Sequence, residues 1–277
     1  MNYTELKLTL SPDYADILTA ELAELGFESF VETDEGLNAY IIEPDFDEAA
    51  VQEVIDRYAL QTAIVYEVTS LEKRNWNAEW EQSYQPIEVG QAVRVRASFH
   101  EPDPAFQFDL VINPKMSFGT GHHETTAMML EHQLSIDHAG KSVLDVGSGT
   151  GILAILAARM GAAPVVAFDI EEWAVENAQE NAALNDCAAI RVFQGTIADV
   201  DTADRYDIVL ANINRNVLLT EIPTYAALMN PGGCLLVSGF YEHDAADIDA
   251  KAREAGLRSV GRKTQNGWCS LVFANPA

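Results

Sequence analysis

The sequence predicts an α/β protein in which a small α+β domain precedes a larger open sheet of mainly parallel strands. Two observations support this fold class. After residue 91, short apolar strands alternate with helices, which is typical of a sheet with helices packed on its faces. Within the first seventy residues, the predicted elements follow the order β-α-β-β-α-β, which is the ferredoxin-like arrangement.

Length and composition are those of a folded globular chain. The 277 residues suggest about two domains, and 48% of them are hydrophobic and 22% charged. No apolar run approaches the ~18 residues that a membrane-spanning helix needs, and the start, MNYTELKLTL, lacks a signal-peptide pattern. The three cysteines, Cys187, Cys234 and Cys269, lie far apart without a C-x-x-C motif. We therefore expect free thiols, a cytoplasmic location and no contact with membranes.

The negative charge is concentrated at the amino terminus. Residues 1–70 contain sixteen Asp or Glu against two Lys or Arg, a net charge of −14 within a total of −26. Such a surface repels nucleic acid and anionic lipid and attracts basic partners. Charge alone leaves two explanations open, which are steering of a basic partner and simple solubility.

The first domain, 1–70, contains no feature of a catalytic site. It has no histidine, no cysteine and no glycine-rich loop. We expect a domain that docks the substrate. Its strands are predicted at 4–10, 27–33, 37–43 and 62–68, and its helices at 11–25 and 47–58.

Residues 71–90, LEKRNWNAEWEQSYQPIEVG, are predicted to link the two domains. Trp76 and Trp80 are four residues apart and share one face if the segment is helical. They could pack the linker onto a domain or form an aromatic wall for a ligand. Packing is the more common use of aromatic side chains, so we favour it.

The centre of the second domain, 91–277, is a βαβ unit at 141–170. An apolar strand at 142–146 is followed by the turn Gly147-Ser148-Gly149-Thr150-Gly151, a helix, and a second strand that ends at Asp169. Glycines in such a turn let backbone N–H groups approach a ligand closely. A carboxylate at the tip of the second strand can accept hydrogen bonds from both hydroxyls of a ribose.

Two details of this unit decide between cofactors. Ile152 stands where a dinucleotide-binding turn has its third glycine, which disfavours NAD. Asp145 adds a negative charge near the turn, which suits an ammonium group better than a pyrophosphate. The D-x-G-x-G-x-G turn followed by a strand and an aspartate resembles the cofactor loop of class I (Rossmann-like) S-adenosylmethionine-dependent methyltransferases.

Asn212 ends the strand predicted at 207–213. Ligands of open α/β sheets bind beyond this edge, where the amide can accept from and donate to a substrate amine. The alternative is a turn-forming asparagine, because Asn214 and Asn216 occupy the same loop. The closing segment 257–274 is predicted to be an antiparallel hairpin, as is typical of class I methyltransferases.

The stretch SFGTGHHETT (117–126) is predicted to be a polar loop that enters a helix at 124–134. It lacks the lysine of a phosphate-binding P-loop. His122, His123 and Glu124 are consecutive, so on a helix neighbours diverge by ~100° and do not converge on a metal; we expect no metal site. The hydroxyls of Thr125 and Thr126 can instead face the ligand of the glycine turn.

The same stretch also resembles a known family. NPKMSFGTGHHETT is similar to the D-P-G-x-A-F-G-T-G-x-H-x-T-T motif of the PrmA family, the bacterial methyltransferases of ribosomal protein L11, and the W-x-x-x-W linker, LDVGSGTGILAI and VLANI match as well. The resemblance implies a protein-lysine N-methyltransferase that uses S-adenosyl-L-methionine. By position, it implies cofactor contacts at Thr126, Gly147, Asp169 and Asn212, with Phe118, Thr120 and Gly149 in the same pocket.

The chain departs from this motif at a few positions. Asn113-Pro114-Lys115 replaces Asp-Pro-Gly, and His122 and Glu124 replace the usual Thr and Pro. These positions bear on the shape of the lid over the cofactor.

The expected reaction is the attack of a neutral amine on a sulfonium methyl group, for which alignment supplies most of the catalysis. Asn212 is the predicted catalytic residue, because it can hold that amine. The expected partner is basic ribosomal protein L11, recognised without direct contact to nucleic acid. Two alternatives remain at this point, an NAD-dependent oxidoreductase and a non-catalytic acidic binding protein.

Overall fold

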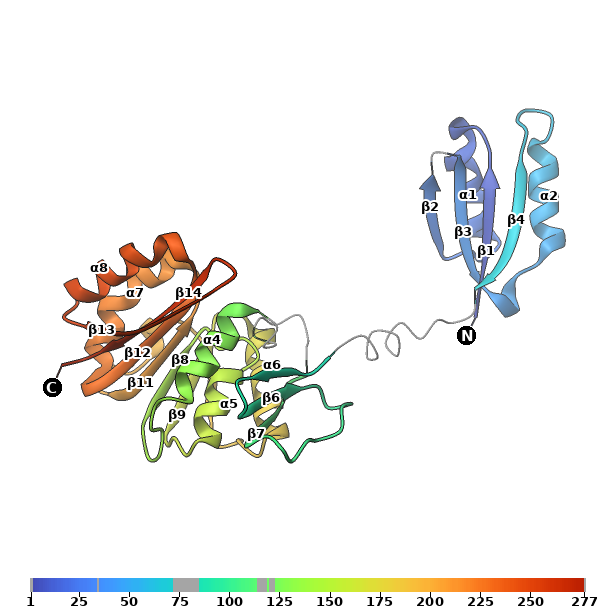
Figure 1. The fold of residues 1–277 in the computed structure, drawn as a ribbon. Helices are drawn as coiled ribbons and strands as arrows, with labels where there is room; N and C mark the ends of the chain where they lie inside the picture. The colour runs from blue at the N-terminus through green and yellow to red at the C-terminus, as the bar shows by residue number, and fades with distance from the viewer. Residues whose placement is uncertain (1, 34, 72–84, 114–118, 120–122, 277) are drawn as a thin grey trace. The chain divides into compact units, whose positions relative to one another are not determined.

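A computed structural model describes residues 2–33, 35–71, 85–113, 119 and 123–276 (Figure 1). The chain divides into two units, a small unit at 1–83 and a large unit at 84–277. The predicted tryptophans of the linker, Trp76 and Trp80, lie outside the described residues.

The small unit contains one antiparallel sheet in the order β2-β3-β1-β4, with two helices. This is the predicted ferredoxin-like arrangement. Leu6 in β1 pairs with Ala39 in β3 and Val68 in β4, and its side chain is fully buried. The strands are β1 (Tyr3–Thr9), β2 (Ser29–Thr33), β3 (Gly36–Ile42) and β4 (Val65–Leu71), and the helices are α1 (Ala15–Glu24) and α2 (Glu48–Tyr58).

Local sequence explains where these two helices begin. The Asp47 carboxylate accepts hydrogen bonds from the backbone N–H groups of Ala49 and Ala50, which caps α2. Helix α1 begins later than the sequence predicts, because residues Pro12–Tyr14 form a 3-10 turn first.

The large unit is built on a seven-stranded sheet in the order β10-β9-β8-β11-β12-β14-β13. Strand β14 runs antiparallel to both of its neighbours, and the adjacent pairs from β10 to β12 are parallel. The strands are β8 (Val143–Val146), β9 (Val165–Asp169), β10 (Arg191–Gln194), β11 (Tyr206–Asn212), β12 (Met229–Tyr241), β13 (Arg258–Gln265) and β14 (Trp268–Ala274). The predicted closing hairpin is therefore present.

Side chains of the central strands alternate between two hydrophobic cores, one on each face of the sheet. Val143 and Ile208 belong to the core under α4, α5 and α6, whereas Leu144 and Val209 belong to the core under α7 and α8. The helices are α4 (Glu124–Gln133), α5 (Ile152–Arg159), α6 (Glu172–Leu184), α7 (Arg215–Leu228) and α8 (Ala245–Glu254).

The connection between β10 and β11 is short. Residues 195–205 are all described and contain a 3-10 helix, η3 (Ile197–Asp199), but no α-helix. On the face that carries α7 and α8, the ends of β8 and β9 beside α7 are therefore not covered by a third helix.

A second, three-stranded sheet precedes the main one in the large unit. Its strands are β5 (Ile87–Val89), β6 (Val93–Arg96) and β7 (Phe108–Val111), in the order β5-β6-β7. Strand β5 lies inside the segment that the sequence analysis assigned to the linker, and Val89 is buried in the core under α4 to α6. No helix separates β6 from β7, so strict alternation of strands and helices begins later than predicted.

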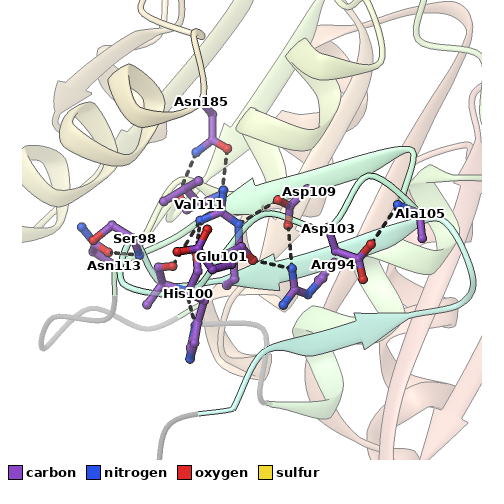
Figure 2. Close-up of polar contacts among 12 residues, drawn as sticks. Arg94, Ser98, His100, Glu101, Asp103, Ala105, Asp109, Val111, Asn113 and Asn185 are labelled. Carbon is purple, nitrogen blue, oxygen red and sulfur yellow. Dashed lines mark hydrogen bonds and ion pairs between the residues drawn. The ribbon is translucent and has the colours of Figure 1, made fainter. Parts of the chain in front are cut away.

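Ion pairs and asparagines hold this sheet in place (Figure 2). The Arg96 guanidinium donates to Asp109 at 2.7 Å and to the carbonyl of His100 at 2.8 Å. The Asn185 amide at the end of α6 bonds both the N–H and the carbonyl of Val111, as Figure 2 shows. These contacts fix the end of β7, from which the chain enters the segment SFGTGHHETT.

Candidate active site

The glycine turn lies at the carboxyl end of β8, as predicted. Gly147 has φ 67°, and a Cβ there would lie 2.5 Å from Cγ2 of Ile213. Both the left-handed backbone and the lack of space require glycine. The turn is tied to the next strand, because the N–H of Ser148 donates to the carbonyl of Phe168.

Asp169 closes the turn from the tip of β9. Its Oδ2 accepts from the N–H of Gly149 at 2.8 Å, and its Oδ1 accepts from the N–H of Glu171 at 3.1 Å. The carboxylate is therefore held in one orientation beside the turn, and each oxygen keeps a lone pair for another donor.

The segment SFGTGHHETT meets the glycine turn at Gly119. The Thr150 hydroxyl donates to the carbonyl of Gly119 at 2.5 Å. A Cβ on Gly119 would lie 2.9 Å from this hydroxyl oxygen, so the two loops touch. The amide of Asn181 joins the glycine turn to the end of the β7 segment, because it donates to the carbonyl of Thr150 and accepts from the N–H of Asn113.

Asn212 at the end of β11 points toward α4. Its Nδ2 donates to the Thr126 hydroxyl at 3.3 Å, and Thr126 itself is fully buried. The Oδ1 of Asn212 is shielded from solvent and accepts no hydrogen bond from any described residue. A buried acceptor without a partner costs free energy unless a ligand supplies the donor.

A cavity of about 550 Å³ opens at these elements. It lies at the carboxyl edge of the sheet and extends along the face that carries α7. The described residues that line it are His123, Thr125, Val146, Gly147, Gly149, Phe168, Asp169, Ile170, Glu171, Trp173, Ala174, Thr196, Ile197, Asn212, Ile213, Asn214, Val217, Glu221, Gly239 and Trp268.

Four of the predicted site residues line this cavity: Gly147, Gly149, Asp169 and Asn212. The Thr126 hydroxyl accepts a hydrogen bond from Asn212 but is not part of the lining, whereas its neighbour Thr125 is. Phe118 and Thr120 lie outside the described residues.

Sequence reasoning missed the aromatic end of the cavity. The rings of His123 and Trp268 meet edge to face with centroids 4.6 Å apart, and Tyr241 stacks on Trp268 at 4.1 Å. Trp268 begins β14, more than a hundred residues after the glycine turn. No local sequence motif predicts that it belongs to the site. It reaches the site because β14 is inserted between β12 and β13.

The described lining of the cavity is anionic. Asp169, Glu171 and Glu221 contribute carboxylates, and none of the described lining residues is a lysine or an arginine. This charge suits a cationic ligand such as a sulfonium with an ammonium group, and opposes a pyrophosphate.

Asp145, whose charge the sequence places near the turn, does not line the cavity. Its side chain is 1% exposed, and Oδ2 accepts from the N–H of Ala154 in the first turn of α5. Burial raises the pKa of Asp145 to about 7, although the bond from Ala154 opposes the shift. This carboxyl group therefore ties the strand before the turn to the helix after it.

This raised pKa makes stability dependent on pH. Between about pH 4 and 7 the folded chain keeps a proton on Asp145 that the unfolded chain has lost, so stability falls as pH rises through this window. We expect the free energy of unfolding of the wild type, relative to Asp145→Asn, to fall by up to about 1.4 kcal/mol per pH unit there. Urea unfolding at pH 5, 6, 7 and 8 measures the difference, and a constant offset between the two proteins would contradict the assignment.

The described residues contain no group of three or more His, Cys, Asp or Glu placed to hold a metal ion. His122 lies outside them, so the absence of a metal site stays a prediction. Among the described helices, none has the length and apolar composition to cross a membrane.

Comparison with known proteins places the chain in a family. The family model described as ribosomal protein L11 methyltransferase (PrmA) matches residues 5–276. The chain belongs to this family. A ribosomal protein L11 methyltransferase of Phocaeicola vulgatus is 42% identical over 278 residues, with 99% of both chains covered. One of Chlorobaculum tepidum is 39% identical, over 98% of this chain and 96% of the relative.

Solved structures agree with this membership. The crystal structure of ribosomal protein L11 methylase from Lactobacillus delbrueckii subsp. bulgaricus has a TM-score of 0.64 and 28% identity, over 70% of this chain and 99% of that chain. A methyltransferase structure from Pyrococcus furiosus, at 17% identity and a TM-score of 0.51, shares the fold. The PrmA-family member is thus a class I methyltransferase, and the prediction that S-adenosyl-L-methionine is its methyl donor is confirmed.

Proposed function

We propose that this chain transfers methyl groups from S-adenosyl-L-methionine to amino groups of ribosomal protein L11 in the cytoplasm. Lysine side chains, the N-terminal amine, or both are the acceptors. The observation that supports it best is the anionic cavity beside the glycine turn, with the unpartnered Oδ1 of Asn212 at its edge.

Asp169 is the residue that would hold the cofactor's ribose. Its two oxygens are oriented by backbone N–H groups and remain able to accept from two hydroxyls. When bound, the cofactor supplies a methyl group on a sulfonium that is a good leaving group. The chain then has to orient the acceptor and exclude water.

Asn212 is the residue that would position the acceptor amine. Its amide nitrogen is engaged by Thr126, which leaves Oδ1 as a fixed acceptor for an N–H of the incoming amine. A lysine with a pKa near 10.4 in water must arrive without its proton, and the Trp268 ring in the lining favours the neutral form by desolvation. The lone pair of the amine then points away from Asn212.

The small unit would dock the substrate. Its net charge of −14 over residues 1–70 complements a basic ribosomal protein, and the described cavity residues all come from the large unit. Docking raises the effective concentration of the target amine at the cavity.

Mass spectrometry of purified ribosomal proteins incubated with the enzyme and S-adenosylmethionine tests the proposal. We expect mass gains in multiples of a methyl group on L11. Methylation confined to other proteins, or none at all, would overturn it. Calorimetric binding of NAD in place of S-adenosylmethionine would support the oxidoreductase alternative.

Replacing Asn212 shows whether its amide holds the acceptor amine or binds the cofactor. If the amide holds the amine, Asn212→Ala should lower kcat by about 100-fold through lost alignment, while the Kd for S-adenosylmethionine changes by less than about 3-fold. The exposed Asn216, in the first turn of α7, provides the matched control, and Asn216→Ala should retain kcat. A rise in Kd that matches the loss in kcat would assign the amide to the cofactor instead.

A further inference from the structure

A carboxylate on α7 reaches the cavity from one face of the sheet. Asn214, Val217 and Glu221 are spaced by three and four residues, so they lie on one side of α7, and all three line the cavity. Glu221 lies about 10 Å along the helix axis from the N-cap residue Asn214. It therefore sits below the edge of the sheet, on the face to which Val146 and Phe168 point.

This part of the cavity is a mainly apolar chamber. Phe168, Ile197 and Val217 line it, and the connection between β10 and β11 contributes the 3-10 helix η3 and no α-helix. Ile170 and Thr196 border it, and Asp169 lies next to it at the tip of β9. A flat ring attached to a ribose held by Asp169 would enter this chamber.

Glu221 is held in position by a buried tyrosine. The Tyr225 hydroxyl donates to Oε2 of Glu221 at 2.5 Å, and the Tyr225 side chain is fully buried. Burial raises the pKa of Tyr225 far above its usual range, so the hydroxyl keeps its proton and remains a donor. No described residue donates a hydrogen bond to Oε1 of Glu221, which leaves this oxygen for a ligand.

This inference rests on the function proposed above, with S-adenosylmethionine as the methyl donor: we infer that Glu221 accepts a hydrogen bond from the exocyclic amino group of the adenine. Phe168, Ile197 and Val217 supply the apolar walls that a purine ring needs, and Glu221 supplies an acceptor that matches an amino group and repels an oxo group. The acceptor amine of the protein substrate is a different N–H donor from the adenine amino group. Asn212 and Trp268 would contact that amine. Glu221 is thus a specificity-determining residue for the base of the cofactor.

Two product analogues test this assignment in the full chain. S-adenosylhomocysteine carries the amino group, and S-inosylhomocysteine carries an oxo group at the same ring position. Calorimetry should show that the wild type prefers the adenosyl compound by about ten-fold or more, the scale of a hydrogen bond to a charged group.

The Glu221→Gln variant gives the sharpest result. Tyr225 still needs an acceptor, so it retains the amide oxygen and turns the NH₂ group toward the cavity. This group can donate to the oxo group and opposes the amino group. We expect the preference for the adenosyl compound to fall by about ten-fold or more, with S-inosylhomocysteine bound more tightly than by the wild type.

Controls separate this role from a structural one. Glu172 is an exposed carboxylate that follows the lining residue Glu171 but does not line the cavity itself. Glu172→Gln should keep the wild-type preference for the adenosyl compound. An unchanged preference in Glu221→Gln overturns the inference, as does a loss of preference in Glu171→Gln instead. If the wild type binds neither compound, the proposed cofactor itself is wrong, which is a distinct outcome.

Discussion

Replacing Asp169 with alanine should weaken the binding of S-adenosylmethionine by about ten- to a hundred-fold, or ~1.5–3 kcal/mol. The carboxylate would accept hydrogen bonds from the ribose, and the same two oxygens accept from the N–H groups of Gly149 and Glu171. The variant therefore loses ligand contacts and the support of the glycine turn together. Titration calorimetry measures the effect directly.

The Asp169→Asn variant distinguishes these two losses. Its amide oxygen can still accept from the N–H of Gly149, but its NH₂ group cannot accept from the N–H of Glu171 or from a ribose hydroxyl. We expect a Kd for S-adenosylmethionine between those of the wild type and Asp169→Ala. The midpoint of thermal unfolding should lie closer to that of the wild type than the midpoint of Asp169→Ala does. A Kd unchanged in both variants would place the ribose elsewhere in the cavity.

A chain that begins at Tyr84 should bind S-adenosylmethionine with the wild-type Kd but fail to methylate intact ribosomal protein L11 at micromolar concentrations. The boundary matters, because a chain that begins at Gly90 would lack β5 and the buried Val89. All described cavity residues lie beyond this boundary, so the cofactor site is retained. Without the small unit, the target amine has no elevated effective concentration.

Cofactor binding by the truncated chain is the internal control for folding. Raising the L11 concentration should restore part of its methylation, because only docking is lost. Activity of the full chain should fall as salt is added, since salt screens the attraction between the acidic unit and a basic substrate. If the truncated chain methylates L11 as fast as the full chain does, the charge of the small unit only serves solubility.

Much of the fold could be predicted from the sequence because its signals are local. The turn that begins at Gly147 follows an apolar strand and precedes a helix, and the sequence Asp-Glu-Gly separates the strands predicted at 27–33 and 37–43. Pro231-Gly232-Gly233 is typical of a turn before a strand that would begin at Cys234, whereas β12 begins at Met229, and its pairing with β11 shifts register between Tyr206 and Ile208. Such a shift depends on the partner strand, and the segment's own sequence does not specify it.

The sequence by itself determined the glycine turn, Asp169 and Asn212, because each stands at the end of a strand whose apolar residues mark it. Only the tertiary structure decided that Trp268 and Glu221 share their cavity. Trp268 arrives through insertion of β14 beside β12, and Glu221 lines the cavity from α7, on the face of the sheet to which Phe168 points. It also decided that Asp145 is buried against α5 and not available to a ligand. The local spacing of apolar residues predicts which face of a helix or strand a residue occupies. Which residues pack against that face depends on elements that are distant in the chain.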